Sequence, residues 1–294
     1  MKQTLIRAPA ISRRRIIETA EDISRRYFHA VGLDRIDLGI SFDSVYEHLI
    51  YPEYEIDLIE DEDLGYDSES GEKIFGRYDP TANEAFIDPC LRNDPRRTFT
   101  LWHEVGGHGI LQGEHLRQQL AKNGSVSTTA TALTPQTEDI LEKQANLFAG
   151  HAAAPRWLVE GSIQKTFGLS RWQPYQFTGP GRYTFALKSG TLFHYCDTFS
   201  EVCLRIAQYI RWRFGQLSFE ALSYQVAQSR MVIDMTERPA APSLLRTEAK
   251  ANKPVRVGQS VRRVDRSHPS MSASRDRLGV LVPELATTAG YDCN

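Results

Sequence analysis

The 294-residue sequence has few cysteines, almost no net charge and no long apolar run. Its four cysteines form no Cys-x-x-Cys pair, the spacing typical of redox motifs and of many structural zinc sites. The formal net charge of −2 gives no overall attraction to nucleic acid or to a membrane surface. No apolar run reaches the ~18 residues of a transmembrane helix, so no membrane span is expected. The four cysteines are Cys90, Cys196, Cys203 and Cys293.

The first residues, 1–4, lack the apolar core of a signal peptide. Reduced thiols and a cytoplasmic location are therefore expected. The hydrophobic share of 41% and the charged share of 24% are ordinary for a soluble globular protein, and no internal repeat is present.

One stretch, residues 97–111, reads as an apolar helix that carries His103, Glu104 and His108. The segment from His103 to His108 is one residue longer than the zinc-protease motif His-Glu-x-x-His. In that motif two imidazoles one turn apart bind Zn²⁺ and the glutamate is the general base. In an α-helix a spacing of five leaves two side chains about 140° apart, against about 40° at a spacing of four.

A π-bulge would repair this mismatch, because it adds one residue to a turn and restores the common face beyond it. Gly106 and Gly107 stand where the extra residue would go, and glycine tolerates a distorted backbone. We therefore predict a widened turn there and one metal shared by His103 and His108. The alternative is a helix with two unrelated histidines and a Gly-Gly break.

Two sequence blocks together resemble the ImmA/IrrE metallopeptidases. The similarity covers about residues 11–155 and resumes around 214–233. It implies an α+β fold, namely a zincin-like metallopeptidase domain with a short sheet packed on the active-site helix, plus C-terminal helices. The inserted glycine and a longer gap between the blocks depart from the family pattern. The blocks are Arg97-Thr98-Phe99-Thr100-Leu101-x-His103-Glu104-Val105-Gly and Glu142-x-x-Ala145-Asn146-x-Phe148-Ala149, the second followed by Pro155.

The resemblance also implies the site residues. Members bind zinc through two histidines and one glutamate, so His103, His108 and Glu142 are the expected ligands of Zn²⁺, with Glu104 as the catalytic general base. Three protein ligands leave one coordination position open, as in catalytic zinc sites. Glu138 replaces Glu142 if the register slips, and an ordinary surface glutamate is the alternative for Glu142.

Further residues receive supporting roles. Ala145 and Ala149 are small enough for the Glu142 helix to approach the His103 helix closely, and Asn146 is expected to support a ligand from behind. Three side chains are candidates for stabilising an oxyanion, namely Tyr78, His115 and His151.

The implied function is a zinc-dependent endopeptidase in regulated proteolysis. Members of the family cleave helix-turn-helix repressors, often in prophage, mobile-element or stress-response settings. The expected partner is a protein or peptide substrate, such as a helix-turn-helix transcriptional repressor on a separate chain.

One alternative function is that of a catalytically inactive, metallopeptidase-like regulator. The other is a DNA-binding regulator that uses the basic face of residues 13–26, the 214–233 segment and the tail. Direct nucleic-acid binding is not expected, because no dense basic recognition face accompanies residues 214–233.

Three parts are predicted along the chain: an ImmA/IrrE-like metallopeptidase domain at 1–160, an insertion loop and C-terminal helical segment at 161–235, and a flexible tail at 236–294. Asp94 is the predicted N-cap of the active-site helix, with Pro95 as its first residue. Ser12 and Ser218 are predicted to cap two further helices. The other predicted helices are 12–31, 42–49, 199–214 and 218–226, the strands are 54–59, 74–78 and 84–87, and the loops are 64–72, 122–137 and 173–183.

Overall fold

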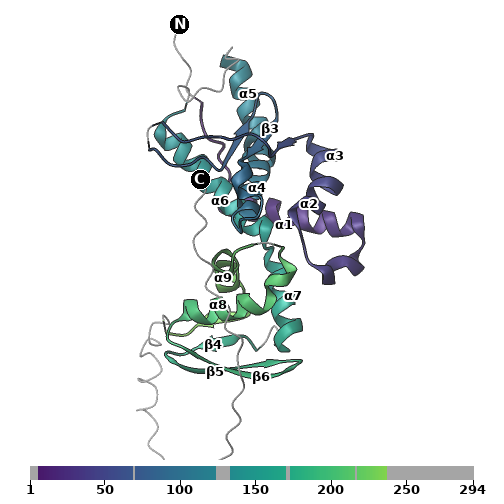
Figure 1. Cartoon of the computed structure of the whole chain (residues 1–294), viewed down its shortest axis with the longest axis vertical. Helices are drawn as coiled ribbons and strands as arrows, with labels where there is room; N and C mark the ends of the chain where they lie inside the picture. The colour runs from purple at the N-terminus through teal and green to yellow at the C-terminus, as the bar shows by residue number, and fades with distance from the viewer. Residues whose placement is uncertain (1–5, 69, 124–132, 170–172, 216, 237–294) are drawn as a thin grey trace, which may run out of the picture. The chain divides into compact units, whose positions relative to one another are not determined.

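The computed structural model describes residues 6–68, 70–123, 133–169, 173–215 and 217–236. Most of the predicted loop at 122–137 and almost all of the predicted tail at 236–294 lie outside these ranges. The described residues form a mixed fold of helices and small sheets, which confirms the α+β part of the prediction (Figure 1). No helix in these ranges combines the length and the hydropathy that a membrane span requires.

The first helix, α1 (Arg13–Val31), begins after Ser12, whose hydroxyl accepts a hydrogen bond from the Arg15 N–H at 3.2 Å. This confirms the predicted cap. Its apolar face is buried against α6. On its outer face Arg14, Arg25 and Arg26 form ion pairs with glutamates. Much of the basic face is therefore neutralised locally.

The next helical segment is longer than predicted. A 3₁₀-helix, η1 (Leu33–Leu38), leads to a continuous run of α2 (Phe42–Val45), the π-helix η2 (Tyr46–Ile50) and α3 (Tyr51–Tyr54). This run ends at Glu55, which has a left-handed φ of 51°. The strand predicted at 54–59 is therefore reduced to β1 (Asp57–Ile59).

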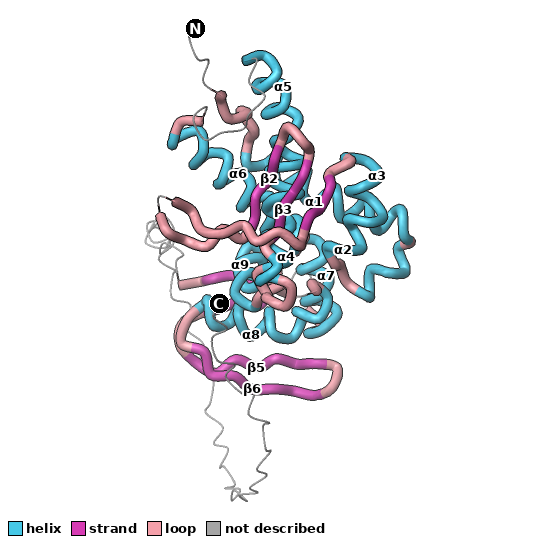
Figure 2. Tube along the Cα trace, turned by 45° about the horizontal axis from the view of Figure 1, so that its top comes forward, coloured by secondary structure: helices cyan, strands magenta, loops and turns pink. Residues whose placement is uncertain are grey.

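A three-stranded sheet has the order β1-β3-β2 (Figure 2). The strands predicted at 74–78 and 84–87 are confirmed as β2 (Gly76–Asp79) and β3 (Glu84–Ile87), which form an antiparallel hairpin, while β1 pairs parallel with β3. The turn of the hairpin places Asn83 at a left-handed φ of 63°. Ala85 and Ile87 of β3 are buried in the main core. The sheet therefore supports the helix that carries the two histidines, and β2 stands at its edge.

That helix begins later and ends later than predicted. After a short 3₁₀-turn, η3 (Pro89–Leu91), α4 (Arg97–Leu101) has Arg96 rather than Asp94 as its N-cap. Asp94 instead closes the preceding turn, since its carboxylate accepts the Arg96 N–H at 2.7 Å. The helix continues as η4 (Trp102–Gln112) and α5 (Gly113–Asn123), so Gly113 does not end it.

The second site helix is α6 (Pro135–Ala153), followed by α7 (Arg156–Phe167). Beyond it, the insertion loop expected at residues 173–183 is contradicted. That region contains β4 (Tyr175–Phe177) and the start of β5 (Gly181–Leu187), which pairs with β6 (Gly190–Cys196). The reason is that alternate residues of β5 pack inward, where Phe185 is fully buried.

The C-terminal helices agree with the sequence pattern. They are α8 (Phe199–Ile210), the 3₁₀-turn η6 (Arg211–Arg213) and α9 (Phe219–Gln228), with Ser218 as the N-cap of α9. The last strand, β7 (Val232–Asp234), pairs parallel with β4. One hydrophobic core includes residues from Ile16 to Val232, so the predicted boundary at residue 160 falls within a shared core.

Candidate metal centre

His103 and His108 lie on the same face of a π-helix. Helix η4 is a π-helix over all 11 of its residues, Trp102–Gln112. Backbone hydrogen bonds in a π-helix join residues five apart, so side chains at that spacing stack as those four apart do in an α-helix. The two Nε2 atoms are 3.1 Å apart. The predicted widened turn is therefore confirmed, and it is longer than a single bulge.

Gly106 and Gly107 are needed for the packing of η4 on α6, and not for the backbone distortion that was predicted. Neither has a positive φ, so backbone freedom does not explain them. A Cβ atom on Gly107 would lie 2.5 Å from Ala145 Cβ and 2.6 Å from Ala145 Cα. A Cβ on Gly106 would overlap the ring of Phe148. The two glycines therefore let η4 lie directly against α6, which brings both histidines close to Glu142.

Glu142 completes a triad with the two histidines. One carboxylate oxygen lies 3.1 Å from His103 Nε2, and the other lies 3.2 Å from His108 Nε2. Donor atoms bound at 2.0–2.2 Å to one tetrahedral ion stand about 3.3 Å from one another, so the three side chains fit a single metal ion. The hydrogen bonds with His103 and His108 hold the pKa of Glu142 well below its usual range, which keeps the carboxylate in its metal-binding form.

A buried glutamine orients His108. The Nδ1 atom of His108 lies 2.9 Å from Gln112 Oε1, and the Gln112 amide in turn donates to the Leu141 carbonyl at 2.8 Å. Because this amide group donates to Leu141 and to Gln144, its oxygen is left to accept from His108. The proton therefore lies on Nδ1 and the Nε2 lone pair faces the triad, as a metal ligand requires.

Glu104 lies beside the triad, and 7% of its surface is exposed. Its Oε1 atom is 4.0 Å from His103 Nε2. On the other side it contacts strand β2, since a Cβ atom on Gly76 would lie 2.7 Å from Glu104 Oε1. Burial raises the pKa of Glu104, so its carboxylate accepts a proton more readily than an exposed one.

A cleft of about 490 Å³ gives access to these groups. One wall contains His103, Glu104 and Glu142. Further lining comes from Gly76 of β2 and from the loop between β1 and β2 that is pink in Figure 2, namely Asp67, Ser70, Glu72, Lys73, Ile74 and Phe75. Asp67, Ser70 and Glu72 of the predicted loop therefore line the cleft, together with Gly76 at the edge of the sheet.

Lys73 anchors this loop wall to the body of the fold. Its ammonium group lies 2.5 Å from the Asp63 carboxylate and 2.9 Å from that of Asp88. Asp88 is buried and also accepts the Leu64 N–H at 3.0 Å. Burial alone raises the pKa of Asp88, but its bonds with Lys73 and with backbone N–H groups hold the pKa well below its usual range.

The other residues that the sequence proposed for the site lie outside the triad. The Tyr78 hydroxyl bonds Asn83 at 2.7 Å, and His115 Nε2 lies 2.8 Å from the Arg7 carbonyl. His151 is buried, and neither it nor the other two candidates for oxyanion stabilisation lines the cleft. Glu138 is exposed one turn before Glu142 and is not part of the triad. Asn146 is also exposed, and within the described residues no hydrogen bond links it to the ligands.

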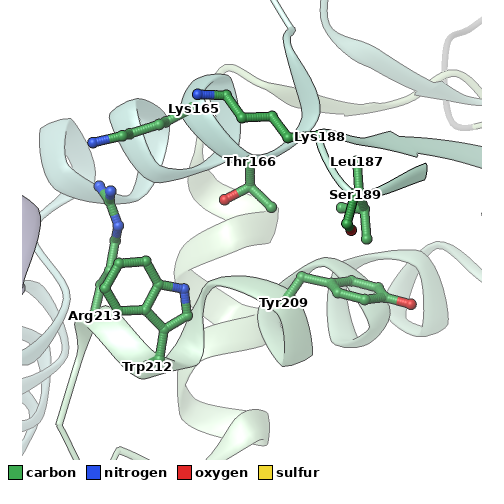
Figure 3. A pocket seen from close by; sticks show the side chains of 8 residues that line it. All are labelled: Lys165, Thr166, Leu187, Lys188, Ser189, Tyr209, Trp212 and Arg213. Carbon is green, nitrogen blue, oxygen red and sulfur yellow. The ribbon is translucent and has the colours of Figure 1, made fainter. Parts of the chain in front are cut away.

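A separate hollow of about 400 Å³ lies between α7, the β5–β6 turn and the end of α8 (Figure 3). Lys165, Lys188 and Arg213 bring basic side chains to it, and Trp212 and Tyr209 line its floor. None of its lining residues belongs to the triad or to the cleft. It is therefore not part of the metal centre.

Neither a scan against protein-family models nor a search of curated proteins finds a match for this chain. The case for the site therefore depends on the arrangement of its own residues.

Proposed function

We propose that this chain is a zinc-dependent endopeptidase with a zincin-like fold, related to the ImmA/IrrE metallopeptidases. The observation that carries the proposal is the convergence of His103, His108 and Glu142, whose donor atoms are separated by distances that suit one tetrahedral ion. A buried carboxylate, Glu104, lies beside them in an open cleft.

The residues of the chain support peptide hydrolysis. His103, His108 and Glu142 would hold the zinc ion, which would supply Lewis acidity for the attack of water. Glu104 takes a proton from the attacking water and passes it to the leaving amine, a role that suits its raised pKa. Gln112 holds His108 in the tautomer that binds metal.

The cleft suits an extended peptide. Strand β2 is an edge strand, so the backbone groups on its outer side are unpaired within the sheet. Such an edge binds a peptide as an additional strand. Gly76 of β2 lies directly against Glu104, which brings a peptide on that edge close to the general base.

The substrate is, in this proposal, a regulatory protein such as a helix-turn-helix repressor, and the reaction takes place in the cytoplasm. The resemblance of the two sequence blocks supports the class of substrate. Cys196 and Cys203 are buried free thiols, which suits a reducing compartment.

The first test is zinc content in the purified protein. Wild type is expected to bind about one zinc per chain, and both His108→Ala and Glu142→Ala are expected to lose it. Glu138→Ala, one turn earlier on the same helix, is the matched control and keeps it. Zinc that survives His108→Ala, or wild type without zinc, would exclude the metal centre.

The second test separates an enzyme from an inactive regulator. Glu104→Gln is expected to keep zinc and to lose cleavage of repressor substrates. The inserted glycine would favour an inactive regulator if it turned the two histidines apart. The π-helix instead keeps both histidines on one face. Equal cleavage by wild type and Glu104→Gln would contradict the proposed mechanism.

A further inference from the structure

The geometry points to a second pocket beside the metal centre, formed by α4, α6 and α9, which receives a bulky apolar side chain of the substrate. The inference rests on the proposed peptidase function, because the occupant is part of a peptide. It adds a determinant of specificity that neither sequence block contains, since one wall comes from the C-terminal helix α9. Helix α6 contacts both α4 and α9.

The pocket lies one helical turn from the metal ligands. Phe99 precedes His103 by four residues, and Asn146 follows Glu142 by four residues. The helices are antiparallel, because Gly107 packs on Ala145 while Gln112 bonds Leu141. One turn back along α4 and one turn forward along α6 therefore lead to the same place.

The pocket adjoins the catalytic cleft. Phe99 and Thr100 line both hollows, and the Phe99 ring centroid is 6.4 Å from that of His103. One turn of helix spans about 5.4 Å and an extended peptide rises about 3.3 Å per residue. A side chain in this pocket therefore belongs to a residue within about two positions of the cleaved bond.

The lining selects an apolar occupant. The hollow measures about 490 Å³, and its walls are largely apolar side chains. Tyr224 is 70% exposed at the rim, so its ring is available for contact. The one charged lining residue, Arg96, already pairs with Asp94 at 2.7 Å. The apolar lining residues are Pro95, Phe99, Leu217, Ala221 and Tyr224.

The polar groups at the pocket suit the peptide backbone. Gln225 is buried, and its Oε1 atom has no hydrogen-bond partner among the described residues. Gly150 allows this close packing, because a Cβ there would lie 2.9 Å from Gln225 Nε2. Asn146 adds an exposed amide on the opposite wall. An amide on each side of an apolar hollow is the arrangement that orients a peptide while its side chain is buried.

The experiment compares cleavage and binding of peptides in which one position at a time is Phe, Leu, Ser or Asp. Zinc-loaded wild type is expected to prefer Phe or Leu at one position within about two residues of the cleaved bond. Ala221→Phe fills the pocket and is expected to lower the kcat/KM ratio of Phe to Ser peptides by about tenfold or more. Ser223→Phe adds the same ring to the same helix outside the pocket and is expected to leave the ratio unchanged.

A binding measurement separates the pocket from the peptidase function. Labelled Phe and Ser peptides are titrated into zinc-loaded Glu104→Gln, with and without Ala221→Phe, and anisotropy is recorded. Phe-dependent binding that Ala221→Phe removes, without any cleavage by wild type, supports the pocket and refutes the peptidase. Cleavage that requires Glu104 but shows no preference at any position refutes the pocket alone. Equal effects of Ala221→Phe and Ser223→Phe also refute it.

Discussion

Replacement of Gly107 by alanine tests the contact between η4 and α6 on which the triad depends. The added methyl group would stand 2.5 Å from Ala145 Cβ and 2.6 Å from Ala145 Cα. Carbon atoms in contact prefer about 3.5–4.0 Å, so the helices must separate by about 1 Å. Because a backbone atom is among the obstacles, no side-chain rotation relieves the overlap.

The magnitude follows from two opposing effects. Overpacking costs about 1–3 kcal/mol, and the upper end applies here because the obstacle is backbone. Alanine regains about 1 kcal/mol of helix propensity over glycine. The free energy of unfolding of Gly107→Ala is therefore expected to fall by about 2 kcal/mol. The separation also moves His108 from Glu142, so zinc affinity falls as well.

The assay is urea unfolding of metal-free protein, followed by the fluorescence of tryptophan, with zinc affinity measured separately by competition with a chelator. Gly161→Ala in α7 is the control, since a Cβ at Gly161 meets nothing within 4 Å. It is expected to be neutral or stabilising. A Gly107→Ala protein with wild-type stability and zinc affinity would refute the role assigned to this contact.

Three further predictions concern the surroundings of the site. Gln112→Leu removes the hydrogen bond to His108 Nδ1 and is expected to weaken zinc binding by about 10–100-fold in a chelator competition; unchanged affinity would exclude its orienting role. Burial lowers the pKa of His151 to about 4, so the unfolded state binds more protons between about pH 6.5 and 4. Stability is expected to fall by about 3 kcal/mol as pH decreases through this window, and His151→Leu should remove that part of the decrease in urea titrations at several pH values. Lys73→Met leaves the buried Asp88 carboxylate without its cation and is expected to cost about 3 kcal/mol in urea unfolding, whereas Asp63→Ala, at an exposed partner, should cost less than about 1 kcal/mol.

The metal centre was predictable because its residues obey local spacing rules. His103 and His108 lie on one helix, so their separation could be tested against helix geometry without knowledge of the fold. Glu142 entered through the resemblance of a second block, and the structure brings it to the two histidines. The close approach of the two helices was expected from the small side chain of Ala145, but the part of Gly107 in it was not, because no local pattern indicates which residue of η4 faces Ala145.

The surroundings of the site depend on such distant contacts. Gln112 follows His108 by four residues, so helical spacing could have suggested it, but its bond to Leu141 required the packing of α6. Lys73 and Asp88 come together only when the loop after β1 folds back. In the C-terminal part, β4 pairs with a strand more than 50 residues away in sequence, which no local pattern reveals.

The π-helix has a consequence for how such sites are recognised. Removal of one glycine from His103-Glu104-Val105-Gly106-Gly107-His108 would produce the standard spelling of the zinc-protease motif. The same deletion would turn one π-helical turn into an α-helical turn and leave Gln112 four residues beyond the second histidine. The two spellings are therefore expected to present the two histidines on the same face of a helix. A motif defined by the direction of its side chains includes this chain, whereas a motif defined by residue types at a fixed spacing does not.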